Sequence, residues 1–270
     1  MTNNPPFGTP NQNDSSIQAV NINQTETNLL FTQDLFPELS KESIVYMREL
    51  NNGCADCCCS WYNLNCSRNV FEVYSLGEIK TLMYTLKEEE IDICPCDCRG
   101  FKMSINNASN NNAVNIMAQK DCKCAGYGMS GCGKPSVYVK VISPQNVLLG
   151  RIKFNFNCCL TLCCTHRLEI RDSSDQILYT IISDNCICPI GLECFCWGKC
   201  FTYKYLIIKG ENREDHPVGT ITKLVCEKCY CDCLTKSDSY NINFPPNSTS
   251  AEKMMFIIAA TFIDHNTFFA

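Results

Sequence analysis

Cysteine is the residue type whose number and spacing in this chain point most directly to chemistry. The 270 residues include 24 cysteines, far more than an ordinary cytosolic protein carries. Dense groups are Cys54, Cys57, Cys58 and Cys59; Cys158, Cys159, Cys163 and Cys164; Cys186, Cys188, Cys194, Cys196 and Cys200; and Cys226, Cys229, Cys231 and Cys233, with smaller groups at Cys94, Cys96, Cys98 and at Cys122, Cys124. Thiols in such runs can form disulfides, bind metal ions or accept acyl chains.

Two of these groups have the spacing of zinc ligands. Thiolates two to four residues apart can share one tetrahedral ion. That spacing occurs at Cys194, Cys196 and Cys200, and again in the group Cys226, Cys229, Cys231 and Cys233, which makes Zn²⁺ a candidate cofactor there. Disulfides require an oxidising compartment, and the first residues lack the basic and apolar regions of a secretory signal, so we expect reduced thiols in the cytosol.

Adjacent cysteines fit zinc less well, because neighbouring side chains of a strand point to opposite faces. S-palmitoylation requires only accessible thiols near a membrane. The acylation candidates are Cys57, Cys58, Cys59, Cys158, Cys159, Cys163 and Cys164. The isolated Cys66 and Cys132 are expected to be small hydrophobic residues of the core.

Other signs of catalysis or nucleic-acid binding are weak. His166, His216 and His265 are scattered, and the sequence has no Gly-rich phosphate loop before a helix and no Gly-x-Ser-x-Gly elbow. The segment 88–90 of three glutamates is interpreted as a solvated loop edge. The formal net charge is −5 and Lys and Arg form no run. We therefore expect neither an enzyme nor a nucleic-acid-binding protein.

Most of the chain after residue 43 has the pattern of short β-strands separated by turn residues. The predicted strands are Val70–Tyr74, Thr81–Tyr84, Phe101–Ile105, Val114–Met117, Val137–Ile142, Leu148–Phe156, Arg167–Ile170, Ile177–Ile182, Phe201–Ile208, Val218–Val225 and Tyr240–Phe244. Turn sequences at 143–146 and 172–175 predict that the strands on either side form hairpins. So many strands without intervening helices favour a barrel or a sandwich.

One helix is predicted at the end of the chain, about residues 250–269. Thr249 and Glu252 have the spacing of a capping box. The run Met254–Ile263 is apolar on every face, so the helix must be surrounded by protein or by lipid. Ten residues rise only about 15 Å, roughly half of a bilayer core, which favours a buried core helix. The residues expected in this core or membrane helix are Met254, Phe256, Ile257, Ile258, Phe262 and Ile263.

The first 40 residues are rich in Asn, Gln, Ser, Thr and Pro and poor in apolar residues, so we expect a disordered polar tail. Residues 41–270 are long enough for one β domain with a sizeable core. Thr2 also excludes N-myristoylation, which requires glycine at that position.

The C-terminal motifs resemble those of the phospholipid scramblases. The segment Asn241–Pro245, Asn-Ile-Asn-Phe-Pro, is similar to the family's FGIQFP motif, and Lys253–Asp264 followed by Phe268 and Phe269 is similar to its C-terminal helix with Ile-Asp and Phe-Phe. Val218–Ile221 is similar to the family's VGKI strand, and Asn69–Gly77 to another of its strands. The resemblance covers about residue 40 to the end.

The resemblance implies a tubby-like fold, a closed antiparallel β-barrel of about 12 strands around the hydrophobic C-terminal helix. It further implies ATP-independent, bidirectional movement of phospholipids between leaflets, palmitoylation, and a location on the cytosolic side of a membrane, expected to be the plasma membrane. Membrane phospholipids would be the partners. A palmitoylated lipid-binding or adaptor barrel without scrambling activity is the alternative.

The resemblance also implies a calcium site just before the helix, in a loop that here reads 236–247. Only Asp238 keeps a carboxylate, whereas Lys236 and Asn247 replace two acidic ligands. Asp238, Ser239, Asn241 and Asn243 remain as oxygen donors of a degenerate calcium loop. Since calcium affinity follows ligand charge, we expect Ca²⁺ binding to be weak or absent.

Overall fold

The computed structural model describes residues 35–50, 69–91, 101–108, 116–120, 136–141, 148–158, 164–184, 203–211, 215–224 and 239–267. The chain divides into two units, residues 1–33 and 34–270, and all of the described residues belong to the second. Within them the elements are β1 (Ile44–Leu50), β2 (Val70–Ser75), β3 (Leu82–Ile91), β4 (Phe101–Asn107), β5 (Ile116–Lys120), β6 (Ser136–Val141), β7 (Leu148–Cys158), β8 (Cys164–Asp172), β9 (Ile177–Ser183), β10 (Lys204–Lys209), β11 (Gly219–Leu224) and β12 (Ser239–Asn243), with helices α2 (Pro37–Ser40) and α4 (Ser250–Thr267).

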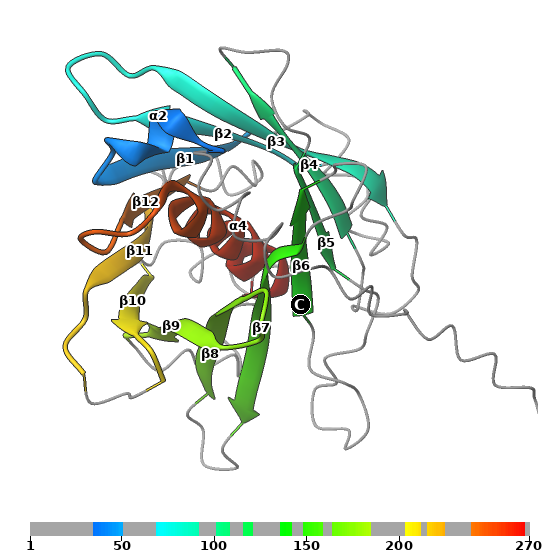
Figure 1. Cartoon of the computed structure of the whole chain (residues 1–270), viewed down its shortest axis with the longest axis vertical. Coiled ribbons are helices and arrows are strands. Elements are labelled where there is room, and N and C mark those ends of the chain that lie inside the picture. The colour runs from blue at the N-terminus through cyan, green and yellow to red at the C-terminus, as the bar shows by residue number, and fades with distance from the viewer. Residues whose placement is uncertain are drawn as a thin grey trace, which may run out of the picture. The chain divides into compact units, whose positions relative to one another are not determined.

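The strands pair antiparallel in chain order (Figure 1). The pairing returns to its starting point because β1 pairs with β2 on one side and with β12 on the other, so the strand order is that of a closed barrel. The expectation of a mainly β, antiparallel architecture is confirmed. Both predicted hairpins are present, β6 with β7 and β8 with β9.

Two features of the strands differ from the sequence-based expectation. Strand β1 was not predicted, although Val45 and Met47 on its inner face are fully buried. Strand β3 continues to Ile91, so the interpretation of 88–90 as a solvated loop edge is wrong. Glu88 is completely buried, and its Oε2 accepts a hydrogen bond of 3.0 Å from the backbone N–H of Asn69. The prediction failed because three consecutive glutamates are typical of a solvent-exposed segment, and their charge gave no indication of a strand.

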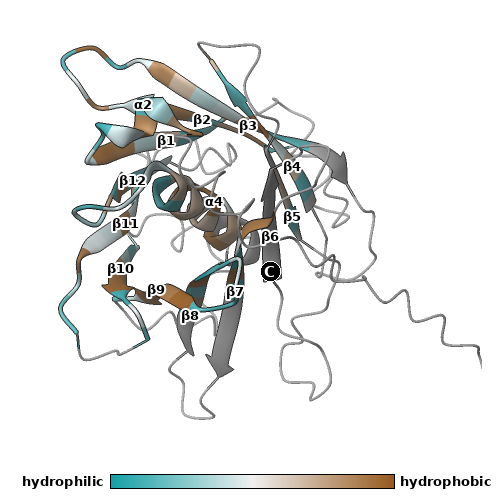
Figure 2. Ribbon diagram, viewed as in Figure 1, coloured by the Kyte–Doolittle hydropathy of each residue, from teal (hydrophilic) through white to brown (hydrophobic). Residues whose placement is uncertain are grey.

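Helix α4 lies in the barrel and forms the centre of its core (Figure 1). The predicted capping box is present: Glu252 N–H donates to Thr249 Oγ1 at 3.2 Å, and Thr249 N–H donates to Glu252 Oε2 at 2.7 Å. Every residue from Lys253 to Ile263 is buried. Figure 2 shows the helix hydrophilic at its start and hydrophobic beyond.

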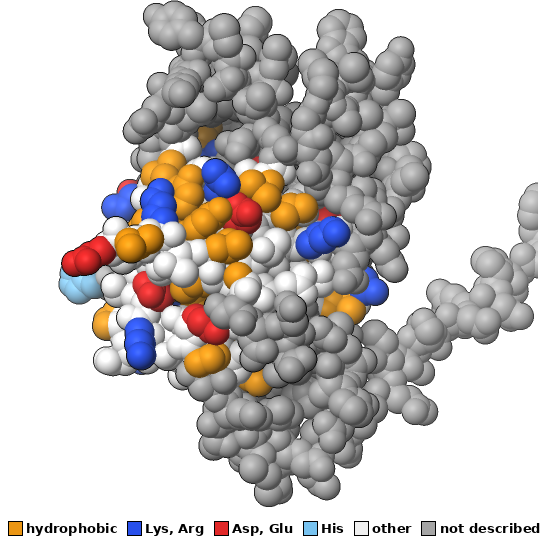
Figure 3. Space-filling model, turned by 90° about the horizontal axis from the view of Figure 1, so that it is seen from above, with side chains coloured by type: hydrophobic (Ala, Val, Ile, Leu, Met, Phe, Trp, Pro, Cys, Tyr) orange, Lys and Arg blue, Asp and Glu red, His pale blue; other side chains and the backbone are white. Residues whose placement is uncertain are grey.

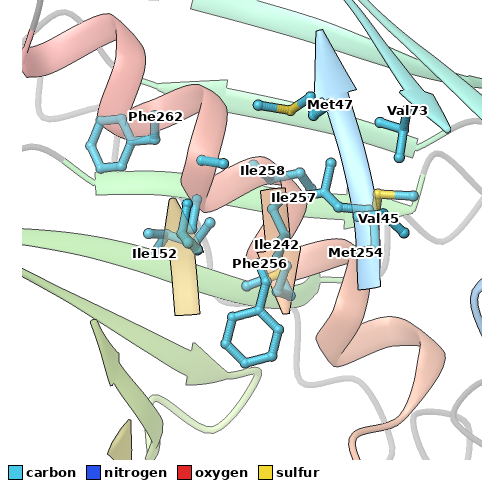
Figure 4. Packing of buried hydrophobic residues seen from close by; sticks show 14 of the residues in the cluster. Val45, Met47, Val73, Ile152, Ile242, Met254, Phe256, Ile257, Ile258 and Phe262 are labelled. Atoms are coloured by element: carbon cyan, nitrogen blue, oxygen red, sulfur yellow. The ribbon is translucent and has the colours of Figure 1, made fainter. Parts of the chain in front are cut away.

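The residues of α4 contact inner side chains of strands from around the barrel. Figure 4 shows Ile257 and Ile258 close to Val45 of β1, and Phe256 beside Ile242 of β12. Phe256 also packs edge to face against Tyr179 of β9, with ring centroids 5.0 Å apart. The six residues expected in the core or membrane helix, Met254, Phe256, Ile257, Ile258, Phe262 and Ile263, are each at most 1% exposed.

The barrel domain begins earlier than the predicted boundary at residue 41. The second unit starts at Asp34, and Phe36 and Leu39 of the short helix α2 region are buried in the core. Glu38 accepts hydrogen bonds from Tyr84 at 2.6 Å and from Asn107 at 2.7 Å. Burial of Glu38 opposes the charged form, yet these two hydrogen bonds lower the pKa of its carboxyl. Residues 35–40 are thus part of the fold, and the rest of the predicted tail lies outside the described residues.

Candidate functional site

The predicted oxygen donors Ser239, Asn241 and Asn243 lie on one strand, β12. They alternate with the buried Tyr240 and Ile242, so all three are on the outer face of the barrel. Successive donors two residues apart along a strand are separated by about 7 Å. Calcium ligands lie about 2.4 Å from the ion, so three donors in a row along a strand cannot surround one ion. Asp238 lies outside the described residues, and weak or absent binding stays a prediction.

Two of these donors already have partners within the barrel. Ser239 Oγ and Tyr46 Oη of β1 are joined by a hydrogen bond of 3.0 Å. Asn243 Nδ2 donates to Thr220 Oγ1 of β11 at 2.9 Å. These contacts link β12 to both of its neighbours and give the side chains a structural role.

A polar and aromatic cluster, which sequence reasoning missed, covers the outer face of β1 and β2. Arg48 Nη2 donates to Glu72 Oε2 at 2.9 Å, and Tyr74 Oη donates to the same oxygen. Lys80 Nζ lies 4.3 Å from the centre of the Tyr46 ring. We call Arg48, Glu72, Tyr74, Tyr46 and Lys80 the Glu72 cluster. Predicting this cluster requires the register between β1 and β2, which decides which side chains lie opposite each other, and the sequence of one strand does not contain that information.

The pKa values of the Glu72 cluster agree with a satisfied ion pair. The hydrogen bond between Arg48 and Glu72 raises the pKa of Arg48, and the hydrogen bond between Tyr74 and Glu72 raises the pKa of Tyr74. Burial opposes the charge on Glu72, but the hydrogen bonds from Tyr74 and Arg48 lower the pKa of its carboxyl. Arg48 already has its carboxylate, so the cluster is poorly suited to bind an anion. Figure 3 shows positive, negative and hydrophobic side chains interspersed over the described part of the upper face.

A second charged group lies on the outer face of β7, β8 and the turn that follows. Arg171 donates to Glu169 at 2.6 Å and also pairs with Asp175, which in turn pairs with Arg151 at 3.2 Å. Arg167 Nε lies 3.5 Å from Glu169. We call Arg151, Arg167, Arg171, Glu169 and Asp175 the arginine group. The hydrogen bond between Arg171 and Glu169 raises the pKa of Arg171. Glu211, whose Oε1 lies 3.9 Å from Arg167 Nη2, adds a third carboxylate beside these three guanidinium groups.

Arg167 is the member of the arginine group with the weakest pairing. Its distances to Glu169 and to Glu211 of 3.5 and 3.9 Å are long for ion pairs, and its side chain is 28% exposed. Arg171, by contrast, is held by two close contacts to Glu169 and is 16% exposed. Arg167 is therefore the guanidinium best placed to exchange its partner for an external anion.

Of the acylation candidates, Cys158 and Cys164 belong to described strands. Cys158 ends β7, Cys164 begins β8, and the two are register partners at one end of this hairpin. Cys57, Cys58, Cys59, Cys159 and Cys163 lie outside the described residues, as do the zinc candidates Cys226, Cys229, Cys231 and Cys233. The described residues contain no cluster of His, Cys, Asp and Glu arranged to hold a metal ion.

Among the helices that the structure describes, none combines the length with the hydropathy that a bilayer-spanning segment requires. Comparison of the chain with protein-family models, with curated proteins and with solved structures finds no match.

Proposed function

We propose that this protein acts at a membrane as an acylated, phospholipid-binding β-barrel of the tubby-like kind. The observation that carries the proposal is the burial of α4. The segment Lys253–Ile263, which resembles the C-terminal helix of scramblases, is the centre of the core around which the strands close. A barrel around such a helix is the architecture that the resemblance implies, and with the helix in the core the protein would attach to lipid through other groups.

Acyl chains on the β7–β8 hairpin are the proposed attachment. Cys158 and Cys164 are register partners, and Cys159 and Cys163 lie between them in the sequence. One acyl chain gives only marginal membrane binding, so stable anchoring requires a second chain or a cationic surface. Four thiols within seven residues of the chain offer that second chain. Cys57, Cys58 and Cys59 are the further candidates.

Arg167 supports the proposal as a contact for an anionic headgroup. It is three residues from Cys164 on the same strand, which is about 10 Å along the strand. A guanidinium this close to an acylated hairpin end would reach the phosphate or carboxylate of a lipid headgroup. Its loose pairing with Glu169 and Glu211 leaves it able to change partner.

Transbilayer movement of phospholipids is the second candidate function. It is favoured by the similarity of Asn241–Pro245 and Lys253–Asp264 to scramblase motifs. Because α4 occupies the interior of the barrel, a headgroup would have to move along the outer surface. The movement would be independent of ATP and, because the calcium loop 236–247 that includes β12 is degenerate, little responsive to Ca²⁺.

A flotation assay tests the first function with the acylated full chain and vesicles that contain phosphatidylserine. We expect the chain to float with the vesicles, hydroxylamine to release it, and Arg167→Gln to weaken binding several-fold at low salt. Arg48→Gln is the matched control, since Arg48 is held by Glu72 on a different face. Flotation that survives hydroxylamine treatment would overturn the proposal.

The second function is tested with the purified chain reconstituted into vesicles that contain a fluorescent phospholipid. Dithionite destroys only the fluorophores that it can reach in the outer leaflet. A lipid-binding barrel leaves the inner-leaflet fluorescence intact, whereas a scramblase exposes both leaflets and removes nearly all of the signal. Addition of Ca²⁺ then shows whether any movement responds to calcium.

A further inference from the structure

Residues 35–40, which we call the strap, are attached to the barrel without belonging to its sheet. The strand order closes from β1 to β12 without them. The strap contains the short helix α2 and ends shortly before β1, and the second unit of the chain begins just ahead of it, at Asp34. Contacts other than strand pairing therefore hold the strap in place.

Two apolar side chains anchor the strap. Phe36 and Leu39 are 1% and 0% exposed, whereas Pro37 and Ser40 are exposed. The Phe36 ring packs edge to face against Tyr84 of β3, with ring centroids 5.9 Å apart. Residues three positions apart lie on the same face of a helical turn. Short helical segments dock onto other proteins through apolar residues spaced in this way.

The carboxylate of Glu38 is the polar anchor of the strap. Tyr84 Oη donates to Glu38 Oε2 at 2.6 Å, and Asn107 Nδ2 donates to Glu38 Oε1 at 2.7 Å. Tyr84 and Asn107 are register partners of β3 and β4. Two neighbouring strands thus present one donor to each oxygen of the carboxylate.

The backbone of the strap is bound as well. Lys253 Nζ donates to the carbonyl oxygens of Leu39 at 2.9 Å and of Ser40 at 3.0 Å. These carbonyls belong to the end of α2, where a helix lacks its own donors and where a cation is favourable. A contact to carbonyl groups does not depend on the side chains that the segment carries.

Tyr84, Asn107 and Lys253, which we call the strap seat, come from β3, β4 and α4. Tyr84 and Asn107 are 46 and 69 positions from Glu38, and Lys253 is 214 positions from Leu39. The strap seat lies at the end of the barrel where β3 begins, β4 ends and α4 enters after β12. The donors belong to the barrel and its helix, so the strap contacts them as a short peptide would.

Recognition at the strap seat uses an apolar face, a carboxylate and the carbonyls of one helical turn, which a segment of another protein can also present. We propose that the strap seat is a peptide-docking site, which the strap occupies in the free protein and which a segment of a partner protein takes over. The partner segment has an aromatic residue, a carboxylate two positions later and a leucine three positions later, the pattern of Phe36, Glu38 and Leu39. This proposal does not depend on lipid binding or on acylation.

The tether between the strap and β1 decides how the exchange can be measured. A segment joined by a short connection has an effective concentration in about the millimolar range, so a free peptide of equal affinity displaces it poorly. Weakening the strap removes this competition. Phe36→Ala removes the ring that packs against Tyr84. Ser40→Ala changes an exposed side chain of the same segment and is the matched control.

The test adds a fluorescent peptide of residues 34–41 to the full chain and measures binding by anisotropy. We expect saturable binding to the Phe36→Ala chain, and binding at least about tenfold weaker to the wild type and to Ser40→Ala, whose straps still compete. The Glu38→Gln form of the peptide should bind the Phe36→Ala chain about tenfold more weakly, because it no longer offers a charged acceptor. An unrelated peptide that keeps only the aromatic residue, the carboxylate and the leucine at the same spacing should bind as the native peptide does.

A variant of the strap seat tests the predicted contact itself. Tyr84→Phe, introduced into the Phe36→Ala chain, keeps the ring but removes the donor to Glu38, and it should also weaken binding of the native peptide. It should cause little further loss with the Glu38→Gln peptide, because the two groups act on each other. If Phe36→Ala does not fold, Glu38→Gln in the full chain weakens the strap while keeping both apolar anchors, and it is measured in the same way.

Three results would overturn the proposal. The first is a folded Phe36→Ala or Glu38→Gln chain that binds no peptide at millimolar concentration. The second is binding that neither the Glu38→Gln peptide nor Tyr84→Phe weakens, which would assign it to nonspecific apolar contact. The third is binding of the native peptide alone, or a dimer in mixtures of wild-type and Phe36→Ala chains, which would reserve the strap seat for this chain or a second copy of it. Vesicle flotation reports the lipid-binding function alone, so the failure of either proposal is seen separately.

Discussion

Lys253 Nζ in the first turns of α4 donates a hydrogen bond of 2.9 Å to the backbone carbonyl of Leu39, which lies 214 positions earlier in the chain. A second bond of 3.0 Å goes to the carbonyl of Ser40. The Lys253 side chain is buried, and Leu39 itself is fully buried in the core. One ammonium group therefore joins the end of α2 to the start of the central helix.

Replacement of Lys253 tests this connection. Lys253→Met keeps the apolar length of the side chain but leaves the carbonyls of Leu39 and Ser40 without their ammonium donor. We expect the free energy of unfolding to fall by about 2 kcal/mol, the usual cost of losing charged hydrogen bonds. Urea denaturation measures it. Lys204→Met, at an exposed position, is the control and should change stability little.

A charge in the middle of α4 should prevent folding. Ile257 is fully buried, so Ile257→Asp forces an unpaired carboxylate into the apolar interior, at a cost of several kcal/mol. We expect the variant to be insoluble or to lack a cooperative thermal transition. Ile79→Asp is the matched control, because Ile79 is 79% exposed. A chain truncated after Asn247 that still melted cooperatively would contradict the core role of α4.

Tyr179 should make the barrel sensitive to alkaline pH. Burial, with a smaller contribution from the charge and hydrogen bond of Glu252, raises the pKa of Tyr179 to about 12. The raised pKa means that the folded chain holds the proton more tightly than the unfolded chain. The stability from this residue is present in full below about pH 10 and is lost as the pH rises towards 12.

The comparison is between the wild type and Tyr179→Phe, which keeps the ring against Phe256 but cannot ionise. Thermal melts between neutral pH and pH 12 should show a smaller loss of stability for the variant above pH 10. Equal loss in both proteins would assign the alkaline sensitivity to other tyrosines.

Gly150 is required where β7 passes close to β8 and α4. A Cβ at this position would lie 2.5 Å from the backbone oxygen of Arg171 and 3.0 Å from Met255 Cε. We expect Gly150→Ala to destabilise the barrel by about 1–3 kcal/mol, because the obstructing oxygen belongs to the backbone. Gly77→Ala, where nothing lies within 4 Å, is the control. Denaturant midpoints of the two variants should therefore differ.

Calcium binding should be at or beyond the millimolar range. The donors Ser239 and Asn243 are engaged with Tyr46 and Thr220, and they are spread along a strand. Isothermal calorimetry on the full chain measures the affinity. Micromolar binding that is removed by Asp238→Ala would show that this expectation is wrong.

The sequence by itself determined the local features. The start of α4 follows from Thr249 and Glu252, which are close along the chain and therefore meet in any helix that begins there. The hairpins β6–β7 and β8–β9 follow from their turn residues for the same reason. The apolar residues on every side of α4 also indicated from the sequence that the helix must be surrounded, and the strands of the barrel surround it.

The tertiary structure alone decided the features that depend on residues far apart in sequence. Glu88 is buried in β3, and its carboxylate accepts a hydrogen bond from the backbone N–H of Asn69, which lies 19 positions earlier, just before β2. Nothing near Glu88 in the sequence indicates that partner. Phe36 and Leu39 belong to the core, and contacts from far along the chain hold this segment: Tyr84 donates to Glu38, and Lys253 donates to the carbonyl of Leu39.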